Sequence, residues 1–202
     1  MTTRPDHASP WVLDTRTLGR RPGSMRPVQV QVPVLEPIGL DVLAVPPGAD
    51  VELDLRLESV AEGVLVSGIA RAEAVGECAR CLGELTVPVT ATIRELFAYP
   101  GSTTAETTDE DEIGRVVDDL VDLEQTVRDE MVLALPLAPL CRPDCPGLCS
   151  ECGEPLADLD ANHSHEILDP RWDALRSRFG AADGPDPEGD PGADPGHRAD
   201  PA

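Results

Sequence analysis

The sequence predicts an α+β fold, an antiparallel β meander followed by one or two helices and a cysteine-rich C-terminal segment. Three observations support this. Apolar and polar residues alternate in several runs between residues 28 and 97, which is the period of a half-buried strand. After residue 120, apolar residues recur every four positions, as on one face of a helix. The six cysteines then fall close to turn residues rather than inside these runs.

Four alternating runs define the predicted strands. In the first, valines alternate with glutamines over residues 28–32. Leucines and a valine alternate with charged residues over 51–58, and a turn at 61–63 leads into a strand over 64–77. The last strand spans 85–97 and contains Pro88, which lacks an N–H group and therefore predicts an edge strand. Short connections between the last three strands indicate an antiparallel meander.

The residues after these strands change in character. Residues 101–119 are acidic and rich in threonine, which predicts a long mobile loop. Leu123, Val127, Met131 and Leu135 recur every four residues and predict an amphipathic helix that Pro136 ends. A second helix is predicted over residues 170–179, with an aspartate as N-cap and a proline at the first helical position.

The predicted organisation is a flexible leader over residues 1–10, one α+β domain over 11–180 and a tail over 181–202. Within the domain, the acidic loop spans 101–119 and the cysteine-rich segment spans 141–165. The tail consists of Gly, Pro and Asp in near-repeat and has no apolar residue larger than Ala, so we expect it to be disordered. His197 lies in this tail and is a poor ligand candidate.

The formal net charge is −22, and all sixteen basic residues are arginines. This charge argues against nonspecific binding of nucleic acid, which requires Lys and Arg to displace phosphate counterions, and suits a basic partner. Aromatic residues make up 2% of the chain, too few for base stacking to be a main binding device. Arg16, Arg20, Arg21 and Arg26 cluster near the N-terminus and could contact phosphate locally, but we interpret them as a solvated face.

The expected localisation depends on apolar runs, on a secretory signal and on the cysteines. No apolar run approaches the roughly 20 residues of a membrane span, and the first ten residues lack the apolar stretch of a secretory signal. The sequence therefore predicts a cytoplasmic protein that does not bind membranes. In a reducing compartment, six cysteines are expected to be metal ligands rather than disulfides.

Cys78 and Cys81 form a C-x2-C motif between the second and third strands of the meander. Gly83 follows and is predicted to allow the tight turn in which backbone amides point at thiolate sulfurs. Such a knuckle supplies two of the four ligands of a tetrahedral zinc ion. A redox C-x2-C motif normally opens a helix, whereas this motif is predicted at the tip of a hairpin.

The second group of cysteines lies among Pro and Gly residues in LCRPDCPGLCSECGEPL. It is followed by two histidines at alternate positions. The group consists of Cys141, Cys145, Cys149, Cys152, His163 and His165. These residue types at this density indicate a metal site.

Eight candidate ligands are enough for two four-ligand sites. The preferred pairing joins Cys78 and Cys81 with Cys141 and Cys145, and Cys149 and Cys152 with His163 and His165. The alternative is one site made of the two C-x2-C motifs. Mixed Cys and His ligands favour zinc, one or two ions, over an iron–sulfur cluster. Because the protein supplies all four ligands, the metal is expected to be structural rather than catalytic.

These motifs resemble those of the bacterial YceD family. The resemblance rests on GECARCL (76–82), LALPLAPLC (133–141), CPGLCSECGEPL (145–156) and DPRWDALRSRF (169–179), in this order, and it covers residues 11–180. Many relatives carry a further cysteine pair where this sequence has His163 and His165. The resemblance implies a role in the accumulation or maturation of large-subunit (23S) ribosomal RNA.

The expected function is therefore that of a non-enzymatic factor in ribosome biogenesis, with ribosomal proteins or precursor rRNA as partners and no small-molecule substrate. The alternatives are a zinc-stabilised protein-interaction or regulatory module and, less favoured, a metal-dependent RNA-processing enzyme. The acidic run at residues 109–112 could in principle bind Mg²⁺ for RNA cleavage, but a run of this kind in a loop is usually solvated. The sequence shows neither a nucleophile–base pair nor a phosphate-binding loop.

Overall fold

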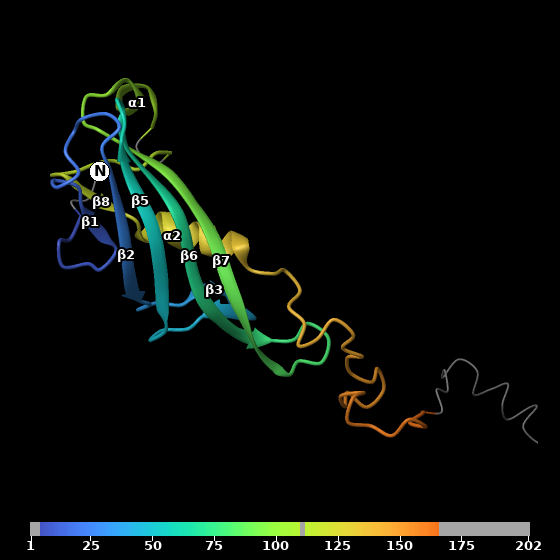
Figure 1. The fold of residues 1–202 in the computed structure, drawn as a ribbon. Coiled ribbons are helices and arrows are strands. Elements are labelled where there is room, and N and C mark those ends of the chain that lie inside the picture. Colours follow the sequence, from blue (N-terminus) through green and yellow to red (C-terminus); the bar gives the residue numbers. More distant parts are fainter. Residues whose placement is uncertain (1–4, 110–111, 166–202) are drawn as a thin grey trace, which may run out of the picture. The chain divides into compact units, whose positions relative to one another are not determined.

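The computed structural model describes residues 5–109 and 112–165. Its main feature is a six-stranded antiparallel sheet in which four long strands lie side by side (Figure 1). In spatial order these are β2 (Met25–Pro33), β5 (Asp50–Ser59), β6 (Gly63–Glu77) and β7 (Glu84–Ala98). They correspond to the four predicted runs, and β5, β6 and β7 form the predicted meander.

Alternation of residue types fixes the register of these strands. Val51 and the three leucines of β5 up to Leu57 are buried, whereas the charged residues between them are exposed. Because side chains of a strand alternate between its two faces, a slip of one residue would bury the whole charged set. The pairing Leu53↔Ala70 joins the buried face of β5 to that of β6, so one face of the sheet carries the core.

A short hairpin that the sequence did not predict lengthens the sheet at one end. It consists of β3 (Ile38–Leu40) and β4 (Leu43–Val45), and β4 pairs with β6 through Leu43↔Gly76. Gly76 permits this close pairing, since a Cβ atom at this position would lie 2.2 Å from the Val42 carbonyl oxygen.

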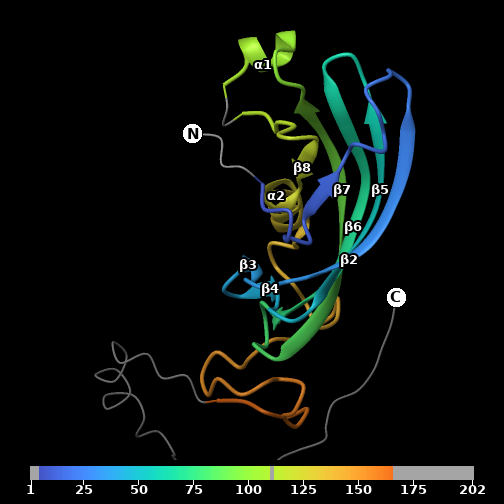
Figure 2. The same ribbon diagram turned by 90° about the vertical axis from the view of Figure 1, so that its left-hand side faces the viewer.

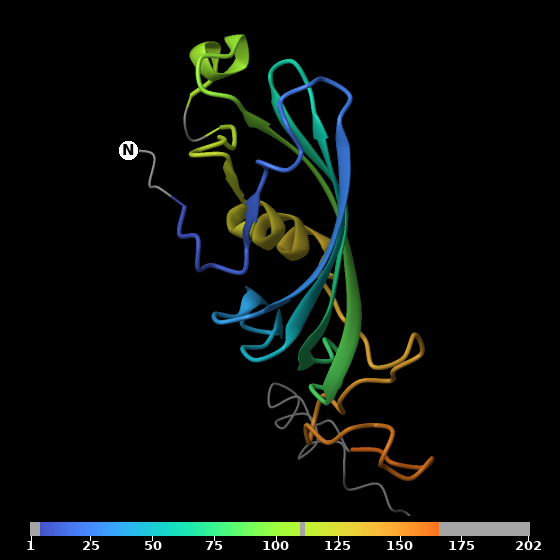
Figure 3. The same cartoon turned by 60° about the vertical axis from the view of Figure 1, so that its left-hand side comes forward.

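The helix α2 (Glu124–Ala134) lies on the apolar face of the sheet (Figure 2). Leu123, Val127, Met131 and Leu135, which share one side of the predicted helix, are all buried. The helix ends before Pro136, as predicted, and its C-cap Leu135 is extended. A two-stranded sheet of β1 (Val12–Asp14) and β8 (Leu120–Asp122) lies on the same side as α2 (Figure 3).

The prediction of a loop over 101–119 is wrong for part of its described residues. Ser102 caps the short helix α1 (Thr103–Thr107), and its side chain accepts a hydrogen bond from the Ala105 amide at 3.2 Å. Farther along, Val116 is buried and its amide donates to the Ala98 carbonyl at 2.9 Å. The acidic composition of residues 101–119 does not indicate these contacts, because each of them involves a single pair of residues.

The described residues are mostly β, with the two helices α1 and α2, of which only α2 was predicted. The second predicted helix, residues 170–179, and the tail lie outside the described residues. The chain divides into two compact units, with a boundary between Leu159 and Asp160. In the part of the chain that the structure describes, no helix has the length and apolarity needed to cross a membrane.

Candidate metal centres

The first candidate centre begins at the tip of the β6–β7 hairpin. Cys78 directly follows β6, and its amide donates to the Gly83 carbonyl at 2.8 Å. The Leu82 amide donates back to the Cys78 carbonyl at 2.9 Å. Leu82 has φ 56°, in the left-handed region, whereas Gly83 does not have a positive φ. The turn is therefore tight, as predicted, but the prediction that Gly83 makes it is wrong: the unusual conformation belongs to Leu82.

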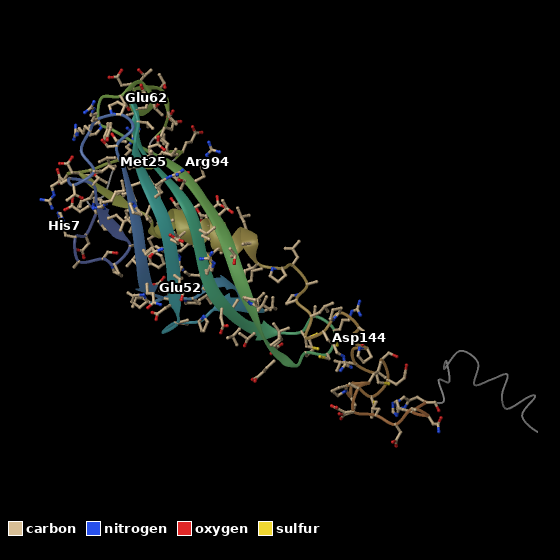
Figure 4. The ribbon with its side chains drawn as sticks, in the orientation of Figure 1. His7, Met25, Glu52, Glu62, Arg94 and Asp144 are labelled. Carbon is tan, nitrogen blue, oxygen red and sulfur yellow. The ribbon has the colours of Figure 1, made fainter. Side chains whose placement is uncertain are left out.

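The other half of this centre comes from the segment that follows α2. Pro136 ends the helix, and two hydrogen bonds to backbone carbonyls then hold the segment against the hairpin tip. The Ala79 amide donates to the Pro139 carbonyl at 2.8 Å, and the Arg80 guanidinium donates to the Cys145 carbonyl at 2.9 Å. Figure 4 labels Asp144 in this segment, close to the end of β6 and β7.

These contacts bring Cys78, Cys81, Cys141 and Cys145 together, and their sulfur atoms all lie within 4.8 Å of one another. The Sγ–Sγ distances are 3.8 Å for Cys78 and Cys145 and 3.8 Å for Cys81 and Cys141. Four sulfurs that surround a zinc ion tetrahedrally at about 2.3 Å are about 3.8 Å apart. A disulfide would require about 2.05 Å. The donor set and its spacing therefore fit a tetrahedral metal ion.

Burial differs among the four thiols. Cys78 is 0% exposed and Cys145 is 3% exposed, whereas Cys81 is half-buried and Cys141 is exposed. The centre thus has one side in the protein interior and one side at the surface. Arg80 covers part of the segment through its bond to the Cys145 carbonyl.

The backbone favours a thiolate at Cys78. The amides of Cys141, Cys81 and Arg80 lower the pKa of Cys78 to about 6. The neighbouring Cys145 thiol and burial raise the pKa of Cys141 to about 12. At Cys81 the Gly83 amide lowers the pKa, but the adjacent Cys78 and burial outweigh it, so the net pKa is raised. Without a cation, one thiolate therefore suppresses ionisation of the others, and a divalent metal would remove this repulsion.

The second group of ligands that the sequence predicts consists of Cys149, Cys152, His163 and His165. Cys149 and Cys152 belong to the first compact unit. The Cys149 amide donates to the Glu154 carbonyl at 2.8 Å, and the Gly153 amide donates to the Cys149 carbonyl at 2.9 Å. Gly153 has φ 75°. This motif is therefore a second knuckle with its own hydrogen-bonded turn.

His163 and His165 belong to the second unit. Their Nε2 atoms are 2.8 Å apart, and the rings meet edge to face with centroids 4.5 Å apart. The His163 amide donates to the Asp160 carbonyl at 2.9 Å, which turns this segment. Alternate spacing brings the two imidazoles to one side, as predicted. Their joint use with Cys149 and Cys152 stays a prediction.

Comparisons with known proteins identify the family. The profile described as "Large ribosomal RNA subunit accumulation protein YceD" matches residues 66–177. The chain belongs to the YceD family. Two relatives, both "Uncharacterized protein", come from Mycobacterium tuberculosis and Mycobacterium bovis. Each is 53% identical over 173 residues, which cover 86% of this chain and 83% of the relative.

A relative from Mycobacterium leprae, also "Uncharacterized protein", is 48% identical over 175 residues, which cover 87% of this chain and 80% of the relative. No solved structure matches. The region that matches the YceD profile contains all eight candidate ligands, from Cys78 to His165.

Sequence reasoning missed the residues that assemble the first centre without being ligands. Ala79, Arg80 and Pro139 carry the contacts between the hairpin and the segment after α2, and Leu82 closes the turn at the hairpin tip. Leu82 gives no sequence signal, because a left-handed turn is normally marked by Gly or Asn. Arg80 could have been noticed as the cation between two cysteines, a position from which a side chain can reach a neighbouring carbonyl.

The four N-terminal arginines and the acidic run over residues 109–112 lie outside the two groups of candidate metal ligands. Arg16 pairs with Asp14 at 2.6 Å, and Arg20 pairs with Asp119 at 3.0 Å and lies over the Tyr99 ring. Arg26 donates to the Asp14 carbonyl at 2.7 Å. Three of the four N-terminal arginines are therefore engaged within the chain. Of the acidic run over 109–112, residues 110 and 111 lie outside the described residues.

Proposed function

We propose that this YceD-family chain is a non-enzymatic factor in the accumulation of 23S ribosomal RNA and that structural zinc stabilises it. The family match is the observation that supports this role, because the family is described as a large ribosomal RNA subunit accumulation protein. The names of the mycobacterial relatives add no function of their own.

The first candidate centre supports a structural rather than a catalytic metal. Four cysteine sulfurs fill a tetrahedron around zinc and leave no position for water or substrate. Zinc at this position would join the β6–β7 hairpin to the chain that leaves α2, two segments that are far apart in sequence. Cys149, Cys152, His163 and His165 have the ligand types for a second zinc ion, which we propose on the basis of the donor set.

The charge of the chain supports a basic protein as its direct partner. A net charge of −22 repels the phosphate backbone of RNA and attracts basic proteins, of which ribosomal proteins are the class that the family role suggests. We propose that the chain works in the cytoplasm, where ribosomal subunits are assembled in bacteria.

The cellular test is a bacterial strain that lacks the gene for this chain, with the ratio of 23S to 16S rRNA measured during growth. We expect the ratio to fall and the wild-type chain to restore it. Cys78→Ser should fail to restore it, because this variant removes a buried sulfur of the first centre. Ser150→Ala, next to a candidate ligand but without a ligand atom, is the matched control. An unchanged ratio in the deletion strain would contradict the proposed role.

The absence of enzymatic activity has its own test. Purified chain is incubated with precursor 23S rRNA and Mg²⁺, and the products are separated by size. We expect the precursor to stay intact, since the metal centres we propose have no open coordination position. Defined fragments that disappear with Cys78→Ser would replace our proposal with an RNA-processing enzyme.

A further inference from the structure

One edge of the main sheet has a run of backbone groups that face away from every described strand. The terminal contacts of the β6–β7 ladder show which groups these are: the Cys78 amide bonds the Gly83 carbonyl, and the Tyr99 amide bonds the Glu62 carbonyl. Hydrogen-bonded pairs recur at every second residue of an antiparallel ladder. Odd-numbered residues of β7 therefore bond to β6, and even-numbered residues direct their N–H and C=O groups outward.

Two features limit the open part of this edge. Pro88 has no N–H group, and Ala98 is already paired, since its amide donates to the Gly114 carbonyl at 2.9 Å. Between them lie the outward groups of Thr90, Thr92, Arg94 and Leu96. Within the described residues these groups have no backbone partner. Thr90, Thr92 and Arg94 are exposed, and Figure 4 shows Arg94 at this edge of the sheet.

The opposite edge of the sheet is protected in a way that β7 is not. The Ser59 amide bonds the Ser24 carbonyl at 2.9 Å, and the Val34 amide bonds the Ala49 carbonyl at 2.8 Å, so odd-numbered residues of β2 face outward. Two of these are Pro27 and Pro33. Proline at outward positions is a common device against unwanted strand pairing. On β7, four successive outward positions lack it.

An acidic hollow lies beside the open edge, on the face that carries α2. Its volume is about 390 Å³. Among its lining residues are five carboxylates and no basic side chain: Glu95, Glu112, Asp122, Asp129 and Glu130. Glu95 comes from β7 itself, within the open part of the edge. Burial raises the pKa of Glu95, the Gly114 amide lowers it and the charge of Glu130 raises it, with a net upward shift. Among the described residues that line the hollow, no basic side chain offsets the charge of these carboxylates.

We propose that the edge of β7 from Thr90 to Leu96 binds an extended, Arg- or Lys-rich protein segment as an added strand. Alternate side chains of an added strand point to the two faces of the sheet. Every second residue of the segment therefore points to the α2 face, where the hollow offers carboxylates. The backbone edge provides affinity, and the hollow selects basic residues at alternate positions. RNA is not the occupant, because five carboxylates repel phosphate.

This inference rests on the proposed function for the identity of the partner, a basic protein of the ribosome, but its test does not. The probe is a synthetic peptide of about ten residues in which Thr and Arg alternate, so that all Arg side chains share one face when it is extended. The control peptide has the same composition with its Arg residues in one block. We expect the alternating peptide to bind the purified full chain more tightly and to slow amide hydrogen exchange at Thr90, Thr92, Arg94 and Leu96.

A proline variant tests the backbone part. Thr92→Pro removes one outward N–H, while the β6–β7 hydrogen bonds are kept, and β7 already tolerates Pro88 at an equivalent position. We expect peptide affinity to fall about tenfold, as for the loss of a hydrogen bond that leaves its partner unpaired. Thr86→Pro, an outward position beyond Pro88, is the matched control and should bind like the wild type. Equal affinity for both variants would overturn the proposed edge.

A charge variant tests the hollow. Asp129→Asn together with Glu130→Gln should weaken binding of the alternating peptide and reduce its dependence on salt. Glu124→Gln, on the same helix but outside the hollow lining, should change neither. Protection of amides elsewhere, no binding of either peptide, or protection of the β7 edge by single-stranded RNA would each overturn the inference. A normal 23S rRNA level in the deletion strain, in contrast, would contradict only the proposed function.

Discussion

The two C-x2-C knuckles of this chain share one backbone design but differ in sequence and surroundings. In each, the amide of the first cysteine donates to the carbonyl five residues later, and the amide four residues later donates back. The residue at that fourth position is left-handed in both: Leu82 at φ 56° and Gly153 at φ 75°. Only the second knuckle has the glycine that this conformation favours.

The two knuckles also differ in burial and in their contacts with the rest of the chain: the one without glycine is the more buried. Cys78 is fully buried, and contacts from Ala79 and Arg80 hold its knuckle to the segment after α2. Cys149 is half-buried and Cys152 is exposed, and the hydrogen bonds of their turn are local. A knuckle that tertiary contacts support can carry a strained leucine, whereas the knuckle whose backbone hydrogen bonds are local has glycine at this position. This comparison separates what tertiary contacts stabilise from what the local sequence stabilises.

The largest effect should come from removal of a ligand in the supported knuckle. Cys78→Ser is expected to lose one equivalent of zinc and to lower the Tm by roughly 10 °C, because the first centre joins two distant segments. Cys152→Ser should also lose zinc, but with a shift of only a few degrees. Native mass spectrometry measures the stoichiometry and calorimetry the Tm. If Cys152→Ser proved the more destabilising variant, the comparison would be reversed.

Release of the metal should be slower from the buried centre. With a chromogenic chelator in excess, we expect zinc to be released in two phases whose rate constants differ by roughly tenfold or more. The slow phase belongs to the first centre, because chelator access to Cys78 and Cys145 requires local opening. Cys152→Ser should remove the fast phase and Cys78→Ser the slow one. A single phase that both variants alter equally would show that the two groups do not act separately.

The same comparison shows what the sequence can and cannot predict. The long strands and α2 were predictable because their apolar periods extend over many residues, as in Leu123, Val127, Met131 and Leu135. Cysteine spacing predicted that Cys78, Cys81, Cys141 and Cys145 come together, and their use as metal ligands stays a prediction. The β3–β4 hairpin and α1 were missed, since three- to five-residue elements depend on single contacts such as the Ser102 cap. The role of Leu82 depends on tertiary support, which no local pattern encodes.

The metal-free protein should show the pKa differences in its stability. The pKa of Cys78 is about 6 in the folded chain against 9.0 ordinarily. Between about pH 6 and pH 9 the folded state therefore holds fewer protons than the unfolded state, and stability rises with pH. The pKa of Cys141 is about 12 in the folded chain. Above pH 9 the Cys141 thiol therefore ionises in the unfolded state but not in the folded state, and stability falls with pH. Chemical denaturation of metal-stripped protein should therefore show a maximum near pH 9. Cys78→Ser should flatten the rise below this pH, whereas Cys152→Ser should keep it.

The smallest effect, and the sharpest comparison, concerns the left-handed positions themselves. Gly153→Leu should destabilise the second knuckle by about 1–2 kcal/mol, the cost of a side chain in this conformation. Leu82→Gly should be neutral to stabilising by about 1 kcal/mol: relief of the same strain, about 1–2 kcal/mol, exceeds the roughly 0.5–1 kcal/mol of chain entropy that glycine adds to the unfolded state. Little packing is lost, since Leu82 is 60% exposed.

Gly83→Ala is the control for this pair. Gly83 lacks a positive φ, and an added Cβ would be 3.4 Å from the Cys81 sulfur, an ordinary contact, so we expect a change within about 0.5 kcal/mol. Urea denaturation of zinc-loaded protein measures all three variants. If Gly83→Ala were the costly one, the turn would depend on the glycine that the sequence suggested. If Leu82→Gly were strongly destabilising, the leucine would make contacts that its exposure does not reveal, and tertiary support of the first knuckle would extend to its tip.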